Sequence, residues 1–171
     1  FMDDNGKLKM SIHALVIEAP GRRIIVDTCL GNDKQGRNVP TWNNLQGTFL
    51  QDLAAAGFAR ESIDTVMCTH LHVDHVGWNT MRMGEKWVPT FPQARYLFGR
   101  REYQHWQHLE ATGGYHHMEH LADSIDPVVQ AGLVEFIDPD FQITDEVSLI
   151  PTPGHTPGHV SVLIRSRGEE A

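Results

Sequence analysis

The feature that most constrains this chain is a run of four metal-ligand side chains within six positions: His70, His72, Asp74 and His75. Residues 65–69, directly before the run, have the composition of a short buried strand. Alternate side chains of an extended segment share a face, so His70 and His72 should lie on one side, with Asp74 and His75 following where the chain turns. Zinc and similar divalent ions prefer neutral imidazole and carboxylate ligands. The run therefore predicts a metal site at the end of a strand.

A second cluster of turn residues and histidines follows near the carboxyl end, as Thr152-Pro153-Gly154-His155-Thr156-Pro157-Gly158-His159. Proline and glycine favour a tight loop after the apolar segment 147–150, and such a loop aims His155 at a fixed point. Together with His70 and His72, His155 is a natural third imidazole for one ion. For His159 we favour a structural or supporting role, because two residues of one short loop do not easily reach one ion from the same side.

Apolar periodicity predicts a mixed α/β domain. Strands are expected at residues 11–19, 23–27, 65–69, 95–98, 133–137, 147–150 and 160–164, with a turn at Pro20 and Gly21 that makes the first two a hairpin. Helices are expected at 49–56 and 127–131, and over 100–122 with a break at Gly113 and Gly114. Strands that alternate with a few helices are typical of layered α/β folds.

The order of these motifs resembles the order found in the metallo-β-lactamase-fold hydrolases. A strand, His-x-His-x-Asp-His at residues 70–75 and Thr-Pro-Gly-His at residues 152–155 follow one another, and Asp27 matches the family's early aspartate. The resemblance covers nearly the whole chain, up to Arg165. The long interval between the motifs and the continuation Val76-Gly77-Trp78 look most like the lactonase and methyl-parathion-hydrolase branch. The implied fold is α/β (an α+β sandwich), the amino-terminal part of a four-layer αβ/βα arrangement without its carboxyl-terminal part.

The resemblance also implies roles for individual residues. His70, His72 and His155 would hold a first metal ion, while Asp74 and His75 would contribute to a second. Asp74 would also be catalytic, because it would orient the nucleophile and take its proton. Two zinc ions are expected, with iron or manganese as alternatives. Family members supply a bridging aspartate and a last histidine later in the chain, so we expect residues 1–171 to be a single metallo-β-lactamase-like domain truncated at both ends.

The implied reaction is the opening of a lactone, of the acyl-homoserine-lactone type, or of a similar ester by a zinc-bound hydroxide. The same chemistry serves phosphotriesters, thioesters and β-lactams, so these substrates stay open. Iron-dependent sulfur dioxygenases share the three-histidine arrangement and are an alternative of a different class. Diiron flavoproteins fit less well, since they tend to place glutamate where His72 stands. A non-catalytic metal-binding remnant is the last alternative.

The charge and composition of the chain indicate which classes of binding partner and which compartment to expect. The chain has 14 Lys and Arg against 22 Asp and Glu, a formal net charge of −8, which argues against nucleic acid because phosphate binding depends on basic residues. Its aliphatic runs are far shorter than the roughly 20 residues that cross a bilayer. Two cysteines permit a reducing compartment, so we expect a cytoplasmic protein, with periplasm or secretion still open. A small-molecule ester or lactone is the expected partner, and the sequence is compatible with a homodimer.

Two further groups of residues lie between the motifs. Five histidines are expected on a solvated helical face, namely His105, His108, His116, His117 and His120. Five large apolar side chains either wall a substrate pocket or belong to the core or a subunit interface, namely Trp78, Met81, Met83, Trp87 and Phe91.

Overall fold

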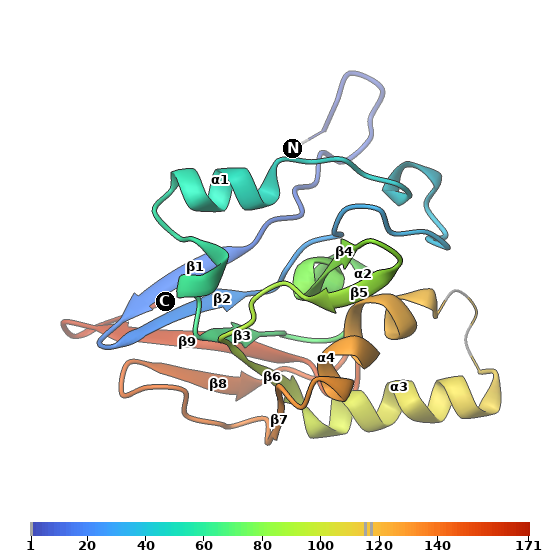
Figure 1. Ribbon diagram of the computed structural model, residues 1–171. Coiled ribbons are helices and arrows are strands. Elements are labelled where there is room, and N and C mark those ends of the chain that lie inside the picture. Colours follow the sequence, from blue (N-terminus) through green and yellow to red (C-terminus); the bar gives the residue numbers. More distant parts are fainter. Residues whose placement is uncertain (1, 115, 117) are drawn as a thin grey trace.

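The frame of the protein is a five-stranded mixed sheet, seen in a computed structural model that describes residues 2–114, 116 and 118–171 (Figure 1). The strand order is β1-β2-β3-β6-β7. The first two strands form an antiparallel hairpin, whereas β2, β3, β6 and β7 run parallel. The bounds are β1 (Leu15–Ala19), β2 (Arg22–Val26), β3 (Thr65–Met67), β6 (Arg95–Gly99) and β7 (Val134–Ile137).

A second, antiparallel sheet and a separate hairpin complete the strands. The second sheet has the order β10-β9-β8, and β4 pairs with β5. Their bounds are β4 (Thr80–Met83), β5 (Lys86–Pro89), β8 (Val147–Pro151), β9 (Val160–Ser166) and β10 (Glu169–Glu170). The α-helices are α1 (Phe49–Ala55), α2 (Val73–Val76), α3 (Arg100–Thr112) and α4 (Asp126–Gln130). Short 3-10 turns cover Pro40–Trp42, Arg60–Ser62 and Gly77–Asn79, and a π-helical turn covers Leu121–Ile125.

The five-stranded sheet separates two hydrophobic clusters, because successive side chains of a strand point to opposite faces. On one face, Ile25, Val66 and Tyr96 pack with residues of α1, α3 and α4, including Leu53, Trp106 and Val128. On the other face, Ile24, Met67 and Leu97 pack with residues of β8 and β9, including Val147, Leu149 and Val160. The layers are thus helices, the mixed sheet and the second sheet.

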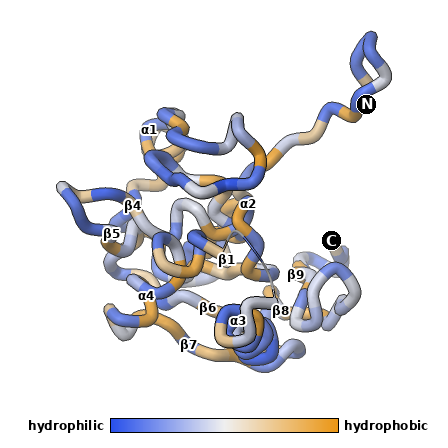
Figure 2. Tube along the Cα trace, turned by 90° about the vertical axis from the view of Figure 1, so that its right-hand side faces the viewer, coloured by the Kyte–Doolittle hydropathy of each residue, from blue (hydrophilic) through white to orange (hydrophobic). Residues whose placement is uncertain are grey.

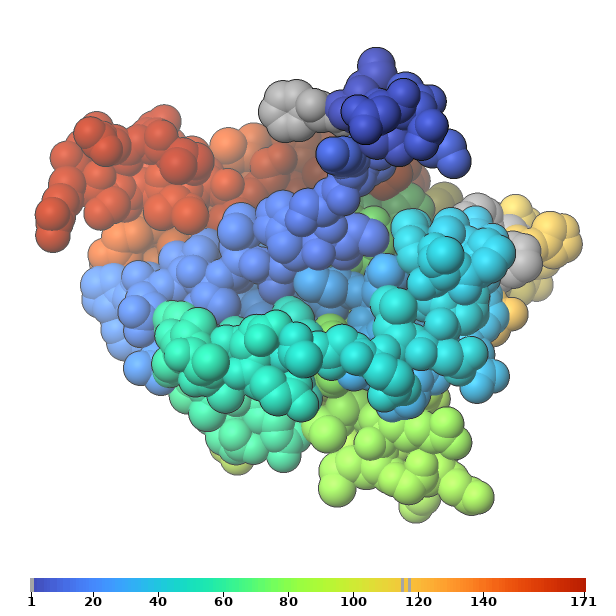
Figure 3. Space-filling model, turned by 90° about the horizontal axis from the view of Figure 1, so that it is seen from above, coloured from blue at the N-terminus to red at the C-terminus, as the bar shows by residue number. Residues whose placement is uncertain are grey.

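This layering brings the two histidine motifs to one edge of the molecule. The chain leaves the carboxyl end of β3 as the loop that carries the first motif, and the turn between β8 and β9 carries the second. The Val160 amide donates a hydrogen bond of 3.1 Å to the Thr69 carbonyl, which ties the two loops together. By contrast, the first described residues of the chain extend away from the body, as Figures 2 and 3 show from two further sides.

The expected α/β class is confirmed, but one hairpin was not anticipated. The residues suggested as a pocket wall lie on or beside β4 and β5, and they do not form a single wall. Trp78 is buried and stacks on Phe49 with ring centroids 5.3 Å apart, and Phe91 belongs to the helix-side core. Met83 is exposed at the hairpin's end. Of the two predicted alternatives, Trp78 and Phe91 therefore follow the core.

The prediction that the five histidines between the motifs lie on a solvated helical face is also only partly correct. Helix α3 ends at Thr112, where Gly113 adopts φ 65°, and His108 and His116 are exposed. His120 instead is 2% exposed and lies edge-on to Trp106 at 5.1 Å. His117 lies outside the described residues. Within the described part of the chain, no helix has both the length and the apolar character required to cross a membrane.

Candidate metal centre

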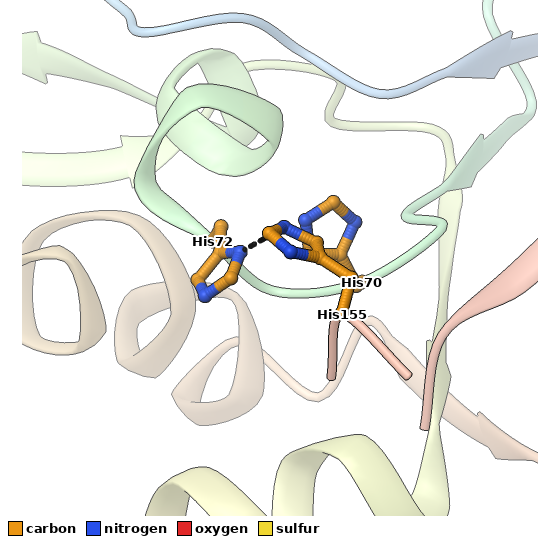
Figure 4. Close-up of side chains that lie close together, drawn as sticks. All are labelled: His70, His72 and His155. Carbon is orange, nitrogen blue, oxygen red and sulfur yellow. Dashed lines mark hydrogen bonds between the residues drawn. The ribbon is translucent and has the colours of Figure 1, made fainter. Parts of the chain in front are cut away.

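Three histidines from two distant loops converge at the edge where the strands end (Figure 4). His70 follows β3, and His72 is the cap residue at the start of α2. His155 comes from the turn between β8 and β9. Figure 4 shows the three imidazoles directed toward one another. The convergence expected from the sequence for these residues is thus present in the structure.

The spacing of the three imidazoles suits a small cation. One nitrogen from each ring lies within 4.8 Å of the other two, and His72 Nδ1 is 2.8 Å from His155 Nε2. Zn–N bonds of about 2.0–2.1 Å in a tetrahedron place ligand nitrogens about 3.3 Å apart. Shifts of roughly an ångström would therefore bring the observed arrangement to that geometry. Burial and the adjacent His155 lower the pKa of His72, which favours the neutral imidazole that a metal requires.

His70 is buried and neutral, and one of its ring nitrogens is free to bind a metal. Its side chain is 2% exposed, its Nδ1 lies 3.1 Å from Thr69 Oγ1, and its buried Nε2 has no hydrogen-bond partner. A buried polar atom without a partner costs about 1–3 kcal/mol. Burial, followed by the charges of His75 and the other histidines, lowers the pKa of His70 to about 2, so its ring is neutral. A cation that accepts the Nε2 lone pair would remove this cost, and the residues therefore fit a metal.

Asp74 and His75 lie beside the three-histidine group, linked to Asp27. Among the described residues, the group of ligand atoms within 4.8 Å comprises the three histidines and excludes this pair. The His75 ring is nevertheless only 4.0 Å from that of His70 between centroids. His75 Nδ1 is 2.8 Å from Asp27 Oδ2, and His75 Nε2 is 3.4 Å from Asp74 Oδ2.

Asp74 and His75 shift each other's pKa, and Asp27 adds to the shift of His75. Burial alone would lower the pKa of His75, but its hydrogen bonds to Asp27 and Asp74 outweigh burial and raise that pKa to about 9. Burial alone would raise the pKa of Asp74, but the hydrogen bond and charge of His75 hold it below its ordinary value. At neutral pH the pair thus places a carboxylate and a protonated His75 next to the cluster, and a metal ion would bind His75 only with release of that proton.

Asp27 joins the end of β2 to the histidine loop. Its carboxylate accepts hydrogen bonds from the Thr69 amide at 2.8 Å and from the Thr69 hydroxyl, in addition to its contact with His75. Asp27 has φ 55°, a left-handed conformation that aspartate tolerates better than most residues. Strain of this kind is often found at functional sites.

A surface cleft of about 310 Å³ reaches the Asp74–His75 pair. One side is formed by the segment before β1 and the start of β1, and the other by the end of β2 and the pair itself. Its apolar lining residues are Met10, Ile12, Leu15 and Val26. The cleft gives a small molecule with apolar parts a route to the histidine loop.

His159 and Glu102 complete the surroundings. The His159 ring lies 4.9 Å from that of His70, and its Nδ1 contacts Thr152 Oγ1 at 2.9 Å, outside the three-histidine group. Glu102 of α3 is buried against both histidine loops. Glu102 is not predictable from its local sequence, since a glutamate in the first turn of a helix ordinarily faces solvent near the helix dipole.

The structure thus defines the chain as a layered α/β protein with a candidate metal centre at its strand ends. Residues 9–170 match the family described as the metallo-beta-lactamase superfamily. The chain belongs to this superfamily, which confirms the expected family.

The chain is similar in sequence to curated lactonases and in fold to solved structures. N-acyl homoserine lactonases from a Bacillus species and from Bacillus cereus are each 26% identical to the chain over 93% of its length. The chain spans about 60% of the length of these curated relatives. A probable metal-dependent hydrolase from Staphylococcus aureus superposes with a TM-score of 0.80 at 19% identity, over 99% of this chain and 59% of that one. A dizinc quorum-quenching lactonase in complex with a product superposes with a TM-score of 0.66 at 24% identity, over 92% and 53%.

Proposed function

We propose that the chain carries the metal-binding part of a hydrolase that opens a lactone of the acyl-homoserine type or a similar ester. The observation that carries this proposal is the convergence of His70, His72 and His155, whose ligand nitrogens lie within 4.8 Å of one another. When bound, zinc would supply Lewis acidity, which polarises a carbonyl oxygen and lowers the pKa of water from about 15.7 to about 7.

The residues of this chain would bind the metal ions, transfer the proton and position the ligands. His70, His72 and His155 would hold the first ion, and Asp74 and His75 would contribute to a second. The Asp74 carboxylate would orient the attacking water, take its proton and help return one to the leaving alkoxide. Asp27 would keep the His75 ring in place through the 2.8 Å contact at Nδ1, as a carboxylate behind a ligand histidine commonly does.

The choice of substrate is supported by similarity and by the shape of the site. The curated relatives at 26% identity are N-acyl homoserine lactonases. The cleft beside Asp74 is lined on its outer side by Met10, Ile12 and Leu15, and such a wall suits an ester with an apolar acyl group. Zinc is the metal we propose; iron or manganese would accept the same donors. The cytoplasmic location and the lack of a nucleic-acid partner stay predictions, and a homodimer stays compatible with the sequence.

The test uses the native protein with every residue that its gene encodes. The His72→Ala variant should lose both metal retention and turnover, measured by elemental analysis and by a pH-indicator assay with acyl-homoserine lactones. His108→Ala, an exposed histidine on α3, is the matched control and should keep both. The substrate panel includes a phosphotriester, a thioester and a β-lactam, and oxygen uptake with a persulfide identifies a dioxygenase. Unchanged metal content and activity in His72→Ala would refute the proposal.

A further inference from the structure

A single buried carboxylate lies behind the histidine cluster and contacts both of its loops. Glu102, in the first turn of α3, is 1% exposed. Its Oε1 accepts hydrogen bonds from the Leu71 amide at 3.2 Å and from the Trp106 indole N–H at 2.8 Å. Its Oε2 accepts a hydrogen bond from the Gly158 amide at 3.0 Å. These charge-assisted bonds are roughly twice as strong as neutral ones.

The two backbone amides belong to the segments that present the ligands. Leu71 lies between His70 and His72, so fixing its amide fixes the peptide units that carry both imidazoles. Gly158 lies in the same tight turn as His155. Glu102 therefore holds, through one rigid group, two loops that are far apart in the sequence. The hydrogen bond from Val160 to Thr69 also joins these loops, but it lies on the strand side of the ligands.

The turn that carries His155 packs directly onto α3 at this point. A Cβ atom on Gly158 would lie 2.5 Å from the Glu102 amide nitrogen and 2.6 Å from its Cβ. Only glycine allows the turn to approach the helix backbone this closely. The close approach brings the Gly158 amide within hydrogen-bond distance of the carboxylate.

Trp106 gives the same carboxylate a third contact with the site. The indole N–H bond to Glu102 fixes the ring, and the ring lies edge-on to His72 with centroids 5.3 Å apart. His72 is thus held through its backbone neighbour Leu71 and packed by a tryptophan that Glu102 orients.

The charge of Glu102 complements a cation in the cluster. No lysine, arginine or histidine side chain of the described residues forms an ion pair with this carboxylate. A buried carboxylate that accepts hydrogen bonds from N–H groups and also acts electrostatically on His72 and His159 favours a nearby positive charge. The three imidazoles add no negative charge of their own when neutral.

We infer that Glu102 is a positioning residue of the metal centre, which sets the spacing between the His70–His72 loop and the His155 turn and so determines how tightly the first ion binds. This inference rests on the proposed function, since it assumes that the three histidines hold a metal.

The Glu102→Gln variant tests the inference with little change in volume. The amide keeps one acceptor oxygen for Leu71 and Trp106, but its NH₂ group would face the Gly158 N–H, donor against donor. We expect zinc affinity, measured by competition with a chromophoric chelator, to fall about 10- to 100-fold, the usual cost of losing a group that orients metal ligands. With cobalt in place of zinc, the visible absorption spectrum at saturation should also change, because the ligand geometry changes.

Controls separate this effect from charge and stability. Glu110→Gln makes the same charge change on an exposed position of α3 and should leave the affinity within twofold. Gly158→Ala breaks the same contact from the other side and should reproduce the loss. Its control is Gly47→Ala, where the nearest atom to a new Cβ is 3.7 Å away. The metal-free Glu102→Gln and Glu110→Gln variants should keep the wild-type circular dichroism, whereas Gly158→Ala should also lose stability, because its Cβ would lie 2.5 Å from the α3 backbone.

The outcomes distinguish this inference from the proposed function. If wild type and His72→Ala bind zinc equally, the proposed function fails. If His72→Ala loses zinc while Glu102→Gln keeps wild-type affinity and an unchanged cobalt spectrum, only the positioning role fails. A Glu102→Gln protein that does not fold with or without zinc would also overturn the inference, because Glu102 would then belong to the general stability of the domain.

Discussion

Replacing the buried Lys34 should change how the stability of the protein depends on pH. The Lys34 side chain is fully buried, and its ammonium contacts Thr80 Oγ1 at 2.6 Å and the Asp123 carbonyl at 2.8 Å. It also lies 3.7 Å from the Asp123 carboxylate and 3.6 Å from the centre of the Trp87 ring. Burial outweighs these attractions, helped by the nearby charge of Arg37, and lowers the pKa of Lys34 to about 7.

The sign and size of the effect follow from proton linkage. Between the folded pKa of about 7 and the unfolded value of 10.5, the unfolded chain binds more protons, so stability rises with pH. A full proton difference changes the free energy of unfolding by about 1.4 kcal/mol per pH unit. Integrated from pH 7.0 to 8.5, where Lys34 starts half-protonated, the gain is about 1.6 kcal/mol.

Urea unfolding of wild type and Lys34→Met at pH 7.0 and pH 8.5 measures this term. Other groups titrate as well, notably His75, so the relevant quantity is the difference between the two proteins at each pH. This difference should shift by about 1.6 kcal/mol in favour of wild type at the higher pH. Lys86→Met, on an exposed lysine of β5, should show no such shift. Equal differences at both pH values would mean that Asp123 and Trp87 keep Lys34 charged, and the reasoning would be refuted.

Three further predictions concern the metal centre and its frame. Asp27→Asn should weaken zinc binding about 10- to 100-fold through loss of the charged contact to His75 Nδ1, measured by chelator competition; unchanged affinity would contradict this role. Gly77→Ala should cost about 3 kcal/mol or more in urea unfolding, because a Cβ there would lie 1.9 Å from the Leu30 carbonyl carbon; a loss below about 1 kcal/mol would show that the loop relaxes easily. Zinc at 100 times its Kd should stabilise wild type by about 2.7 kcal/mol, a gain that a chelator reverses and that should be absent in His155→Ala.

The sequence was most informative where periodicity and turn chemistry act locally. Alternating apolar residues predicted the strands on both sides of the first turn, and Gly113 marked the end of α3. The hairpin of β4 and β5 was missed, since its strands are short and the apolar residues around it serve the core on one side only. Similarly, the burial of His120 depends on its contact with Trp106, which no local pattern of residues reveals.

The sequence by itself determined the ligand types of the site and the two loops that carry them, because the metal-ligand side chains and the Pro-Gly turn each lie within a short stretch of the chain. Which of these side chains meet was decided by the tertiary structure. The parallel pairing of β3 with its neighbours and the packing of β8 and β9 bring His155 to His70 and His72, while Asp27 and Glu102 come from other elements. Such contacts join residues far apart in the chain, so their geometry exists only once the layers have packed.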